Sequence, residues 1–426
     1  MDNMLKLFNS LGKKLESFEP VHPNRVTLFT CGPSVYQRSH IGNFRTFLFE
    51  DILVRYLEFS GYRVERGMNF TDLEDKALRE AEKRGVSLRT LTDENIGRFL
   101  EEMNLLRMKR PDYLVRASEA IEESVEIIER LLDRGIAYRF KGNVYFDPLK
   151  FPRFGSLFGL DMGKWPKKKR RFHRDTYPGM NWNLGDFILW HGCKKADSSC
   201  WETRIGKGRP SWNIQDPSMV MKHFDETLSI YCGGFDNLIR HHDYSIAILE
   251  SVRPYPMAKF WLHGYHLSVN GRKMSKSRGN VYYVEDLLRQ GYDAAAIRFF
   301  LIYGHYRQKL NFTFEAMRKV TERLRGFQGK FDSLRARAAQ ETSTDADSQA
   351  ASQLRSLFSR WMDDDLRVRE AFDALDRFLS EQHIPSLSPS ATRGFLKGLR
   401  EIDQVLQVLT KEEAGITPSP EKSFPG

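Results

Sequence analysis

The strongest constraint on the fold is a strand–helix–strand unit close to the N-terminus. Residues 25–31 (RVTLFTC) are apolar and rich in β-formers, as expected of a buried strand, and Gly32 ends the run. From His40 onward, apolar residues recur at helical spacing, at Ile41, Phe44, Leu48, Ile52 and Tyr56. A second strand is predicted over residues 62–69. Two strands joined by one helix indicate a doubly wound α/β fold with a parallel sheet.

The turn before this helix has the composition of a phosphate-binding site. His40-Ile41-Gly42-Asn43 lies where the helix is predicted to begin. A helix start that follows a strand presents free N–H groups and the positive end of the helix dipole to an anion. His40 and Asn43 would add hydrogen-bond donors, and Gly42 would let a nucleotide approach the backbone closely. We therefore expect a nucleotide phosphate here.

A second motif, Lys273-Met274-Ser275-Lys276-Ser277, lies more than two hundred residues downstream. Lys273 and Lys276 provide two ammonium groups on flexible stems, which suit a closing loop. Taken alone, each motif is more often an ordinary helix start or a solvated turn. Together, in this order, they predict a site that holds ATP from two sides, where a carboxylate attacks the α-phosphate.

Composition limits the class of protein. A chain of 426 residues is too long for one ordinary domain, and 41% hydrophobic with 12% aromatic residues supports a packed core. No apolar run approaches the roughly 20 residues of a membrane span, and the N-terminus lacks a signal core, so we expect a cytoplasmic protein with no membrane partner. A net charge of +10 favours a polyanionic partner. The basic run 167–171 is either a solvated loop or an RNA contact.

The four cysteines are too few for a disulfide scaffold at this length. They are Cys31, Cys193, Cys200 and Cys232. Reduced thiols or metal ligation are therefore expected.

Hydrophobic patterning predicts a catalytic domain over residues 1–311, with an insertion at about 90–220, and a helical domain over 312–412. The helices are expected at 92–108, 117–134, 313–336, 350–381 and 390–410. A polar linker is expected at 341–352, and the tail 413–426 is expected to be disordered.

Several segments, in this order, resemble the cysteinyl-tRNA synthetases, a class I family. The similarity runs from about Leu5 to about Leu409. It is carried by Cys31-Gly32-Pro33-Ser34-Val35-Tyr36, His40 to Asn43, Asn69 to Lys76, Gly208 to Trp212, Gly233 to Asp236, Lys273 to Asn280, and Gly304 to Arg307. The resemblance implies a Rossmann-like catalytic domain followed by a helical, DALR-like domain. It also implies an ATP- and Mg²⁺-dependent ligase that forms an aminoacyl-adenylate, cysteine by default, and transfers the amino acid to tRNA. We also expect a monomer.

The family also implies roles for individual residues. The catalytic contacts to the phosphates would come from His40, Asn43, Lys273 and Lys276. ATP or the adenylate would be bound by Gly32, Gly42, Gly233, Gly234, Asp236 and Ser275. The amino-acid pocket would be lined by Cys31, Ser34, Thr71, Trp212, Asp216 and His241.

The family's zinc site is changed in this chain. In the family, two cysteines, a histidine and a glutamate hold a zinc ion that binds the substrate thiol. Cys31 and His241 match, but the second cysteine position is Asp216 and the glutamate position is Ser245. We therefore expect zinc to be lost; the alternative is that Cys31, Asp216 and His241 form a weak, open site. Asp216 would otherwise face the cation of a different substrate, such as an amine.

The sequence does not decide which molecule accepts the activated amino acid. The family carries an anticodon-reading module where this chain ends soon after Leu409. One alternative is therefore the same adenylation step with a small-molecule, peptide or carrier-protein acceptor, as in the relative that joins cysteine to an amino sugar in mycothiol synthesis. A non-catalytic binding protein is disfavoured, because His40, Lys273 and Lys276 are all present.

Overall fold

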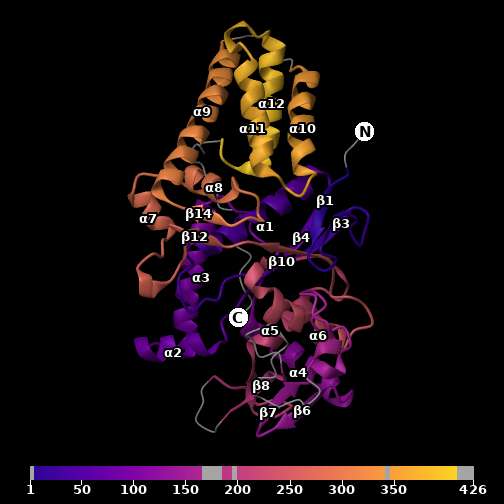
Figure 1. The fold of residues 1–426 in the computed structure, drawn as a ribbon. Coiled ribbons are helices and arrows are strands. Elements are labelled where there is room, and N and C mark those ends of the chain that lie inside the picture. The colour runs from indigo at the N-terminus through magenta and orange to yellow at the C-terminus, as the bar shows by residue number, and fades with distance from the viewer. Residues whose placement is uncertain (1–3, 166–184, 194–198, 341–345, 410–426) are drawn as a thin grey trace.

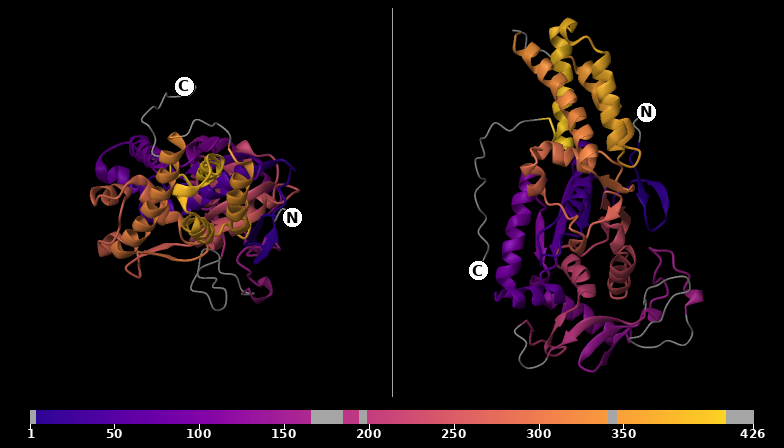
Figure 2. Two further views of the ribbon diagram at one scale, coloured as in Figure 1. Left: turned by 90° about the horizontal axis from the view of Figure 1, so that it is seen from above. Right: turned by 60° about the vertical axis from the view of Figure 1, so that its left-hand side comes forward.

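The computed structural model describes residues 4–165, 185–193, 199–340 and 346–409. An α/β body occupies the centre, a helical bundle stands on one side of it, and a small antiparallel sheet lies at the opposite end (Figure 1). The right-hand view of Figure 2 shows the same order of parts. The basic run 167–171 and the tail 413–426 lie outside the described residues.

The centre of the body is a five-stranded sheet in which every neighbouring pair is parallel. In spatial order the strands are β11 (Ala258–Gly264), β10 (Leu228–Gly234), β3 (Arg25–Thr30), β4 (Arg63–Phe70) and β5 (Tyr113–Arg116). The order reverses between β3 and β10, the position at which doubly wound sheets bind their ligands. The predicted fold class is therefore confirmed.

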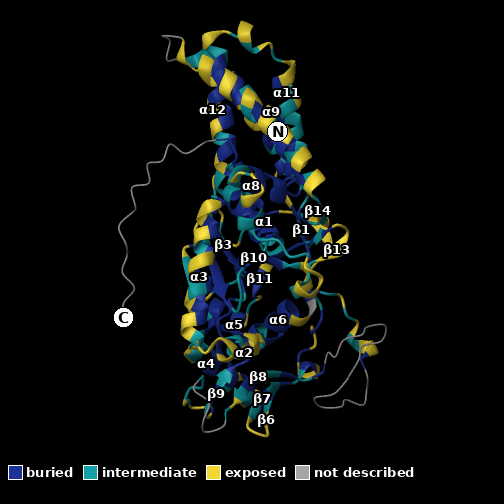
Figure 3. Cartoon of the chain, turned by 90° about the vertical axis from the view of Figure 1, so that its left-hand side faces the viewer, coloured by how far each residue is buried: buried dark blue, intermediate teal, exposed yellow. Residues whose placement is uncertain are grey.

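Helix α1 (Ile41–Phe59) connects β3 to β4 and matches the predicted helix. It contacts β4 on the sheet side and helices α8 (Ala294–Ile302) and α12 (Pro389–Leu406) on the other side. It is therefore buried along most of its length, as is the sheet (Figure 3). This burial requires its charged residues to be paired.

The segments between β4 and β10 include three helices and an antiparallel sheet. The helices are α2 (Asp75–Arg84), α3 (Leu88–Leu105) and α4 (Ile121–Asp133). The strands are β6 (Ala137–Phe140), β7 (Asn143–Phe146), β8 (Phe187–Gly192) and β9 (Gly208–Pro210). Helix α5 (Trp212–His223) leads into β10, and a π-helical turn (Leu238–His242) runs into α6 (Asp243–Glu250).

The expectation that all four cysteines are thiols or metal ligands is wrong for two of them. Cys193 and Cys200 form a disulfide, whereas Cys31 and Cys232 are free and buried. The two bonded cysteines lie at the end of β8 and shortly before β9. Adjacent antiparallel strands bring them together, which the count of cysteines did not reveal.

Two small sheets complete the body. A hairpin of β1 (Lys6–Asn9) and β2 (Lys14–Ser17) precedes β3. The other sheet combines β12 (Leu267–Val269), β13 (Arg272–Lys273) and β14 (Leu310–Phe312), with α7 (Val284–Arg289) and α8 between β13 and β14. The lysine motif starts on β13 and is therefore attached to the rim of the body.

The bundle consists of α9 (Phe314–Ala339), α10 (Ser348–Met362), α11 (Val368–Glu381) and α12. The prediction of one helix over 350–381 is wrong, because the chain turns between α10 and α11. Asp365 and Leu366 adopt positive φ there, and the Asp365 carboxylate accepts hydrogen bonds from Tyr306 (2.6 Å) and Arg307 (2.6 Å). Contacts with the body therefore fix the break. Helix α10 also starts inside the predicted polar linker.

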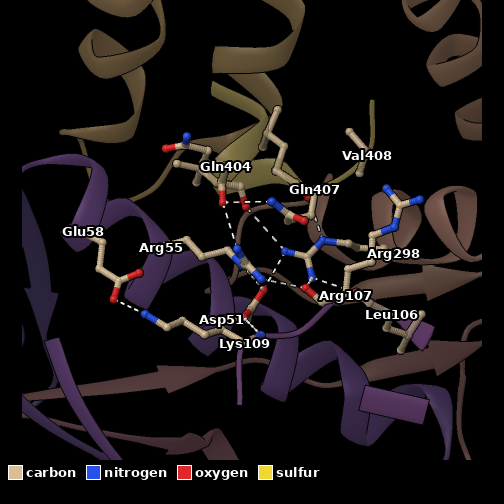
Figure 4. Close-up of polar contacts among 12 residues, drawn as sticks. Asp51, Arg55, Glu58, Leu106, Arg107, Lys109, Arg298, Gln404, Gln407 and Val408 are labelled. Atoms are coloured by element: carbon tan, nitrogen blue, oxygen red, sulfur yellow. Dashed lines mark hydrogen bonds and ion pairs between the residues drawn. The ribbon is translucent and has the colours of Figure 1, made fainter. Parts of the chain in front are cut away.

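A buried polar network joins the bundle to the body (Figure 4). Arg298 of α8 and Asp51 of α1 are both fully buried, and their side chains meet at 2.6 Å. Arg298 also donates to the carbonyl oxygens of Leu106 (2.9 Å) and Leu406 (2.7 Å), and Arg55 donates to Asp51 at 3.0 Å. One arginine thus connects α1, the end of α3 and the last turn of α12. The division of the chain at residue 311 remains a prediction.

Candidate active site

Both predicted motifs line one cavity of about 440 Å³, a size typical of ligand pockets. It opens at the carboxyl ends of β3 and β10, where the strand order reverses. The predicted residues that line it are Cys31, Gly32, Ser34, His40, Gly42, Asn43, Thr71, Trp212, Gly234, Asp236, His241 and Lys273. The other four predicted residues, Asp216, Gly233, Ser275 and Lys276, adjoin lining residues in sequence or contact.

His40 and Asn43 form reciprocal hydrogen bonds at the start of α1. His40 is the N-cap: its Nδ1 accepts a hydrogen bond from the Asn43 backbone N–H (3.2 Å), and the Asn43 side chain accepts one from the His40 N–H (3.0 Å). Burial lowers the pKa of His40, and the positive charge of Lys276 lowers it further. A neutral imidazole with Nδ1 as acceptor carries its proton on Nε2. His40 is therefore a neutral Nε2–H donor.

The lysine motif forms a loop that is closed by hydrogen bonds to Asn280. Ser275 N–H donates to the Asn280 side chain (2.9 Å), and the Asn280 amide donates to the Lys273 carbonyl oxygen (3.3 Å). Gly279, with φ of +64°, makes the left-handed turn that this closure requires. Lys273 and Lys276 are exposed and have no ion-pair partner in the described part of the chain. Their charges are thus available to an anionic ligand.

The front turn and the lysine loop touch. A Cβ on Gly42 would lie 2.2 Å from the Met274 methyl group and 3.1 Å from the His40 ring. Glycine leaves room for this approach, whereas a larger residue would have to displace the flexible end of Met274. Lys276 lies near enough to His40 for its positive charge to lower the pKa of the imidazole.

The loops after β3 and β4 are tied together beside this contact. Gly32 N–H donates to the Asn69 side chain at 2.6 Å, and Val35 N–H donates to the Thr71 carbonyl oxygen at 3.2 Å. A Cβ on Gly32 would lie 1.9 Å from the Asn69 carbonyl oxygen. Gly32 is therefore required by backbone packing as well as by its place in the cavity wall.

Sequence reasoning missed several cavity residues. Lys76 stands over the Tyr36 ring, with its ammonium 5.3 Å from the ring centroid. His266 lies just after β11, with Nε2 3.9 Å from an Asp236 carboxylate oxygen. Since ligands of parallel sheets bind beyond the carboxyl ends of the strands, the position of His266 was a usable signal.

Behind the cavity, four buried side chains gather with their donor atoms within 4.8 Å of one another: Cys31, Asp216, His241 and His242. The Asp216 carboxylate is 2.7 Å from His241 Nε2 and 3.2 Å from Cys31 Sγ, which is itself 3.0 Å from His242 Nε2. His242 was missed, although the adjacent histidine pair was visible in the sequence.

Ser245, at the family's glutamate position, does not join this group. Its hydroxyl donates to the His241 carbonyl oxygen at 2.8 Å. The described residues therefore provide one sulfur, one carboxylate and two imidazoles, a donor set that zinc accepts. The expected loss of zinc stays a prediction.

The electrostatics of the cluster follow from its burial. Burial raises the pKa of Cys31, and the neighbouring Asp216 carboxylate raises it further. Burial alone would raise the pKa of Asp216, but the charge and hydrogen bond of His241 and the hydrogen bonds from Tyr231 and Cys31 outweigh it, so this pKa is lowered. Burial lowers the pKa of His242 well below its usual value. These side chains therefore favour a neutral imidazole at His242 and a carboxylate at Asp216.

The indole of Trp212 separates part of this cluster from the cavity. It stacks on the His241 ring with centroids 4.2 Å apart and planes inclined by 6°. Trp212 is 37% exposed, whereas His241 is buried. A ligand in the cavity would therefore meet the indole before most of the His241 ring.

Comparison with known proteins supports one family. Residues 17–322 match the model of the tRNA synthetases class I (C) catalytic domain. The chain is 37% identical to a cysteine–tRNA ligase of Chlamydia muridarum, over 97% of this chain and 89% of that protein. It is 35% identical to a cysteine–tRNA ligase of Koribacter versatilis, over 96% and 83% of the two chains.

Solved structures share the fold at lower identity. The Mycobacterium tuberculosis methionyl-tRNA synthetase in complex with methionyl-adenylate has a TM-score of 0.63 and 16% identity, covering 91% of this chain and 90% of its own. The Agrobacterium radiobacter ternary complex LeuRS–tRNA–LeuAMS has a TM-score of 0.64 and 12% identity, covering 92% and 85%. In the described part of the present chain, no helix is long and apolar enough to cross a bilayer.

Proposed function

Because the chain belongs to the class I tRNA synthetases and, within them, to the cysteine–tRNA ligase family, we propose that it activates cysteine with ATP and transfers it to tRNA. The observation that carries this proposal is the single cavity lined by both His40-Ile41-Gly42-Asn43 and the lysine loop. ATP bound there would have its phosphates between a helix N-terminus and two free ammonium groups.

The first step forms a bond between a cysteine carboxylate oxygen and the α-phosphorus and breaks the bond from that phosphorus to the pyrophosphate. Negative charge grows on the α-phosphate oxygens and on the leaving pyrophosphate. The Nε2–H of His40 and the N-terminus of α1 stabilise this charge from one side. Lys273 and Lys276 do so from the other side, and the Mg²⁺ that enters with ATP neutralises further phosphate charge.

The remaining predicted residues would orient the substrates. Gly42 and Gly234 leave room for the nucleotide, and Asp236 with its neighbour His266 offers polar groups to the ribose or base. At the other end of the cavity, Thr71 and Trp212 would hold the amino acid. Cysteine is the substrate that the family relationship favours.

Transfer to tRNA is supported by the family and by the charge of the chain. A net charge of +10 favours association with a polyanion. The helical bundle stands beside the catalytic body, and we propose that residues 312–412 form a separate domain that supports the acceptor (Figure 2).

The test is ATP–pyrophosphate exchange with each of the twenty amino acids, followed by charging of bulk tRNA. We expect cysteine-dependent exchange and acid-stable cysteinyl-tRNA. Exchange without tRNA charging would shift the acceptor to a small molecule, peptide or carrier protein. If no amino acid stimulates exchange, with or without tRNA, the proposal is refuted.

A further inference from the structure

We propose that Arg38 is a positioning residue for adenylation, which restrains the lysine loop (residues 273–280) beside the front turn (residues 32–43). The inference rests on the proposed function and adds to it a residue that lies outside both phosphate-binding motifs. Arg38 acts by connecting the front turn to helix α3 and to the start of α7, the helix that follows the lysine loop.

The Arg38 guanidinium uses all three of its nitrogens to bind two carboxylates on different helices. Its Nε and one terminal nitrogen donate to Glu102 of α3 at 2.8 and 2.6 Å, and the other terminal nitrogen donates to Glu285 of α7 at 2.6 Å. The guanidinium carbon also lies 5.2 Å from the centroid of the Tyr283 ring, the N-cap residue of α7. A planar group with donors in a fixed fork suits such a branched contact, whereas a lysine ammonium does not.

The contact with α3 is fixed, whereas the contact with α7 is open to solvent. The Glu102 side chain is 7% exposed and that of Glu285 is 42% exposed. Helix α3 is itself tied to the front turn, because the Asn95 side chain donates to the Val35 carbonyl oxygen at 3.0 Å. Arg38 therefore has a rigid support on α3, and its bond to Glu285 is the part that holds α7.

The position of α7 matters because only residues 281–283 separate it from the lysine loop. At the other end of the loop, Lys273 belongs to β13, which pairs with β12. Before α7, the Ile41 N–H donates to the Tyr282 carbonyl oxygen at 3.0 Å, next to the residues that Arg38 holds. The loop is thus anchored at both ends, and the second anchor is the front turn itself. Since Lys276 is exposed between these anchors, they determine where its ammonium can reach.

Arg38 also lies between two like charges. Burial raises the pKa of Glu102, Arg38 opposes this rise, and the charge of Glu285 adds to it, because the two carboxylates repel each other. Without the guanidinium that both of them contact, this repulsion would push the start of α7 away from α3. The lysine loop, which leads into α7, would move with it.

A direct contact with ATP is the alternative role for Arg38, because Arg38 lines the catalytic cavity. It also lines a groove between α3 and α7, on the side where its two carboxylate partners lie. All three of its nitrogens are used by those carboxylates, so its charge is already neutralised. This arrangement favours positioning over phosphate binding, and the two roles predict different kinetics.

Double-variant kinetics test the proposal, with pyrophosphate exchange by the full-length chain as the readout. Arg38→Gln should lower kcat by about 10- to 100-fold, the scale for a catalytic group displaced by about 1 Å, with a smaller change in KM for the amino acid. Glu285→Gln should reproduce part of this loss and keeps the buried pair of Arg38 with Glu102, so folding is preserved. In a chain that already carries Lys276→Ala, Arg38→Gln should lower the rate by less than about threefold more, since the group that it positions is gone.

Arg98→Gln is the matched control, because Arg98 lines the same groove but pairs with Glu94 within α3. It should leave the rate unchanged. Hydrogen exchange of the backbone amides over residues 274–288 is a readout that needs no activity. It should be at least about threefold faster in Arg38→Gln and Glu285→Gln than in the wild type and Arg98→Gln.

Equal rates for Arg38→Gln and Arg98→Gln would overturn the proposal. So would losses from Arg38→Gln and Lys276→Ala that multiply in full, because Arg38 would then bind ATP directly or only support the fold. If the wild-type chain catalyses no pyrophosphate exchange, the proposed function fails, and the hydrogen-exchange comparison still decides whether Arg38 restrains the lysine loop.

Discussion

Lys276→Ala probes the proposed clamp on ATP with little interference from folding. Lys276 is exposed and has no ion-pair partner in the described part of the chain, so its removal leaves no buried group unpaired. The free energy of unfolding should change by less than about 0.5 kcal/mol. The rate of adenylation should fall by about 10²- to 10³-fold, or about 2.7–4 kcal/mol, the scale for one lost contact to charge that develops in the transition state.

Pyrophosphate exchange at saturating ATP and amino acid measures the rate, and thermal unfolding measures the stability. Lys319→Ala is the matched control, because Lys319 is an exposed lysine that pairs with Glu315 on α9, in the bundle. The ring signals of His40, titrated by NMR, give a second readout. Lys276 lowers the pKa of His40, so its removal should raise that pKa. A rate equal to that of the control, with an unmoved His40 titration, would refute the clamp.

Three further predictions concern the framework of the site. Arg298→Met should lower the free energy of unfolding in urea by about 3–5 kcal/mol. It removes one of the two arginines that pair with the buried Asp51 carboxylate, and it leaves the carbonyl oxygens of Leu106 and Leu406 without this donor; a loss typical of a surface substitution would contradict this. Gly32→Ala should lower the melting temperature and weaken amino-acid binding, since the new Cβ would lie 1.9 Å from the Asn69 carbonyl oxygen. Gly97→Ala is the control: Gly97 lies inside helix α3, a Cβ there meets nothing within 4 Å, and the melting temperature should not fall. Burial raises the pKa of Glu50 from 4.5 to about 8, so the native state keeps a proton that the unfolded chain has lost. Stability should therefore fall as the pH rises through this window, and Glu50→Gln should flatten the slope measured by urea unfolding at several pH values; an unchanged slope would count against the buried acid.

Most of the framework was predictable because it rests on local patterns. The alternation of buried strands with a helix of regular apolar spacing predicted β3, α1 and β4 to within a residue or two. Residues at the carboxyl ends of parallel strands share one edge of the sheet, so the motifs after β3 and β10 could be assigned to one cleft. The break between α10 and α11 could not, because Asp365 is held there by Tyr306 and Arg307 of the body.

The metal-ligand candidates were likewise only partly predictable from the sequence. Cys31, Asp216 and His241 were found by matching this sequence to the ligand positions of the family. Because two of the four family ligands are replaced at those positions, the same comparison predicted that zinc is lost. His242 enters only through the π-helical turn, whose geometry depends on the packing around it. In a regular α-helix, successive side chains point about 100° apart, so the His242 imidazole would point away from that of His241.

The sequence by itself determined the class of fold and the two phosphate-binding motifs, since periodicity, glycine positions and charged residue types are local properties of the chain. Only the tertiary structure decided which distant groups meet. Met274 lies against Gly42, Cys31 meets His242 across 211 positions of the chain, and Arg298 meets Asp51 across 247. Such contacts depend on how the layers pack, and packing is a property of the whole folded chain.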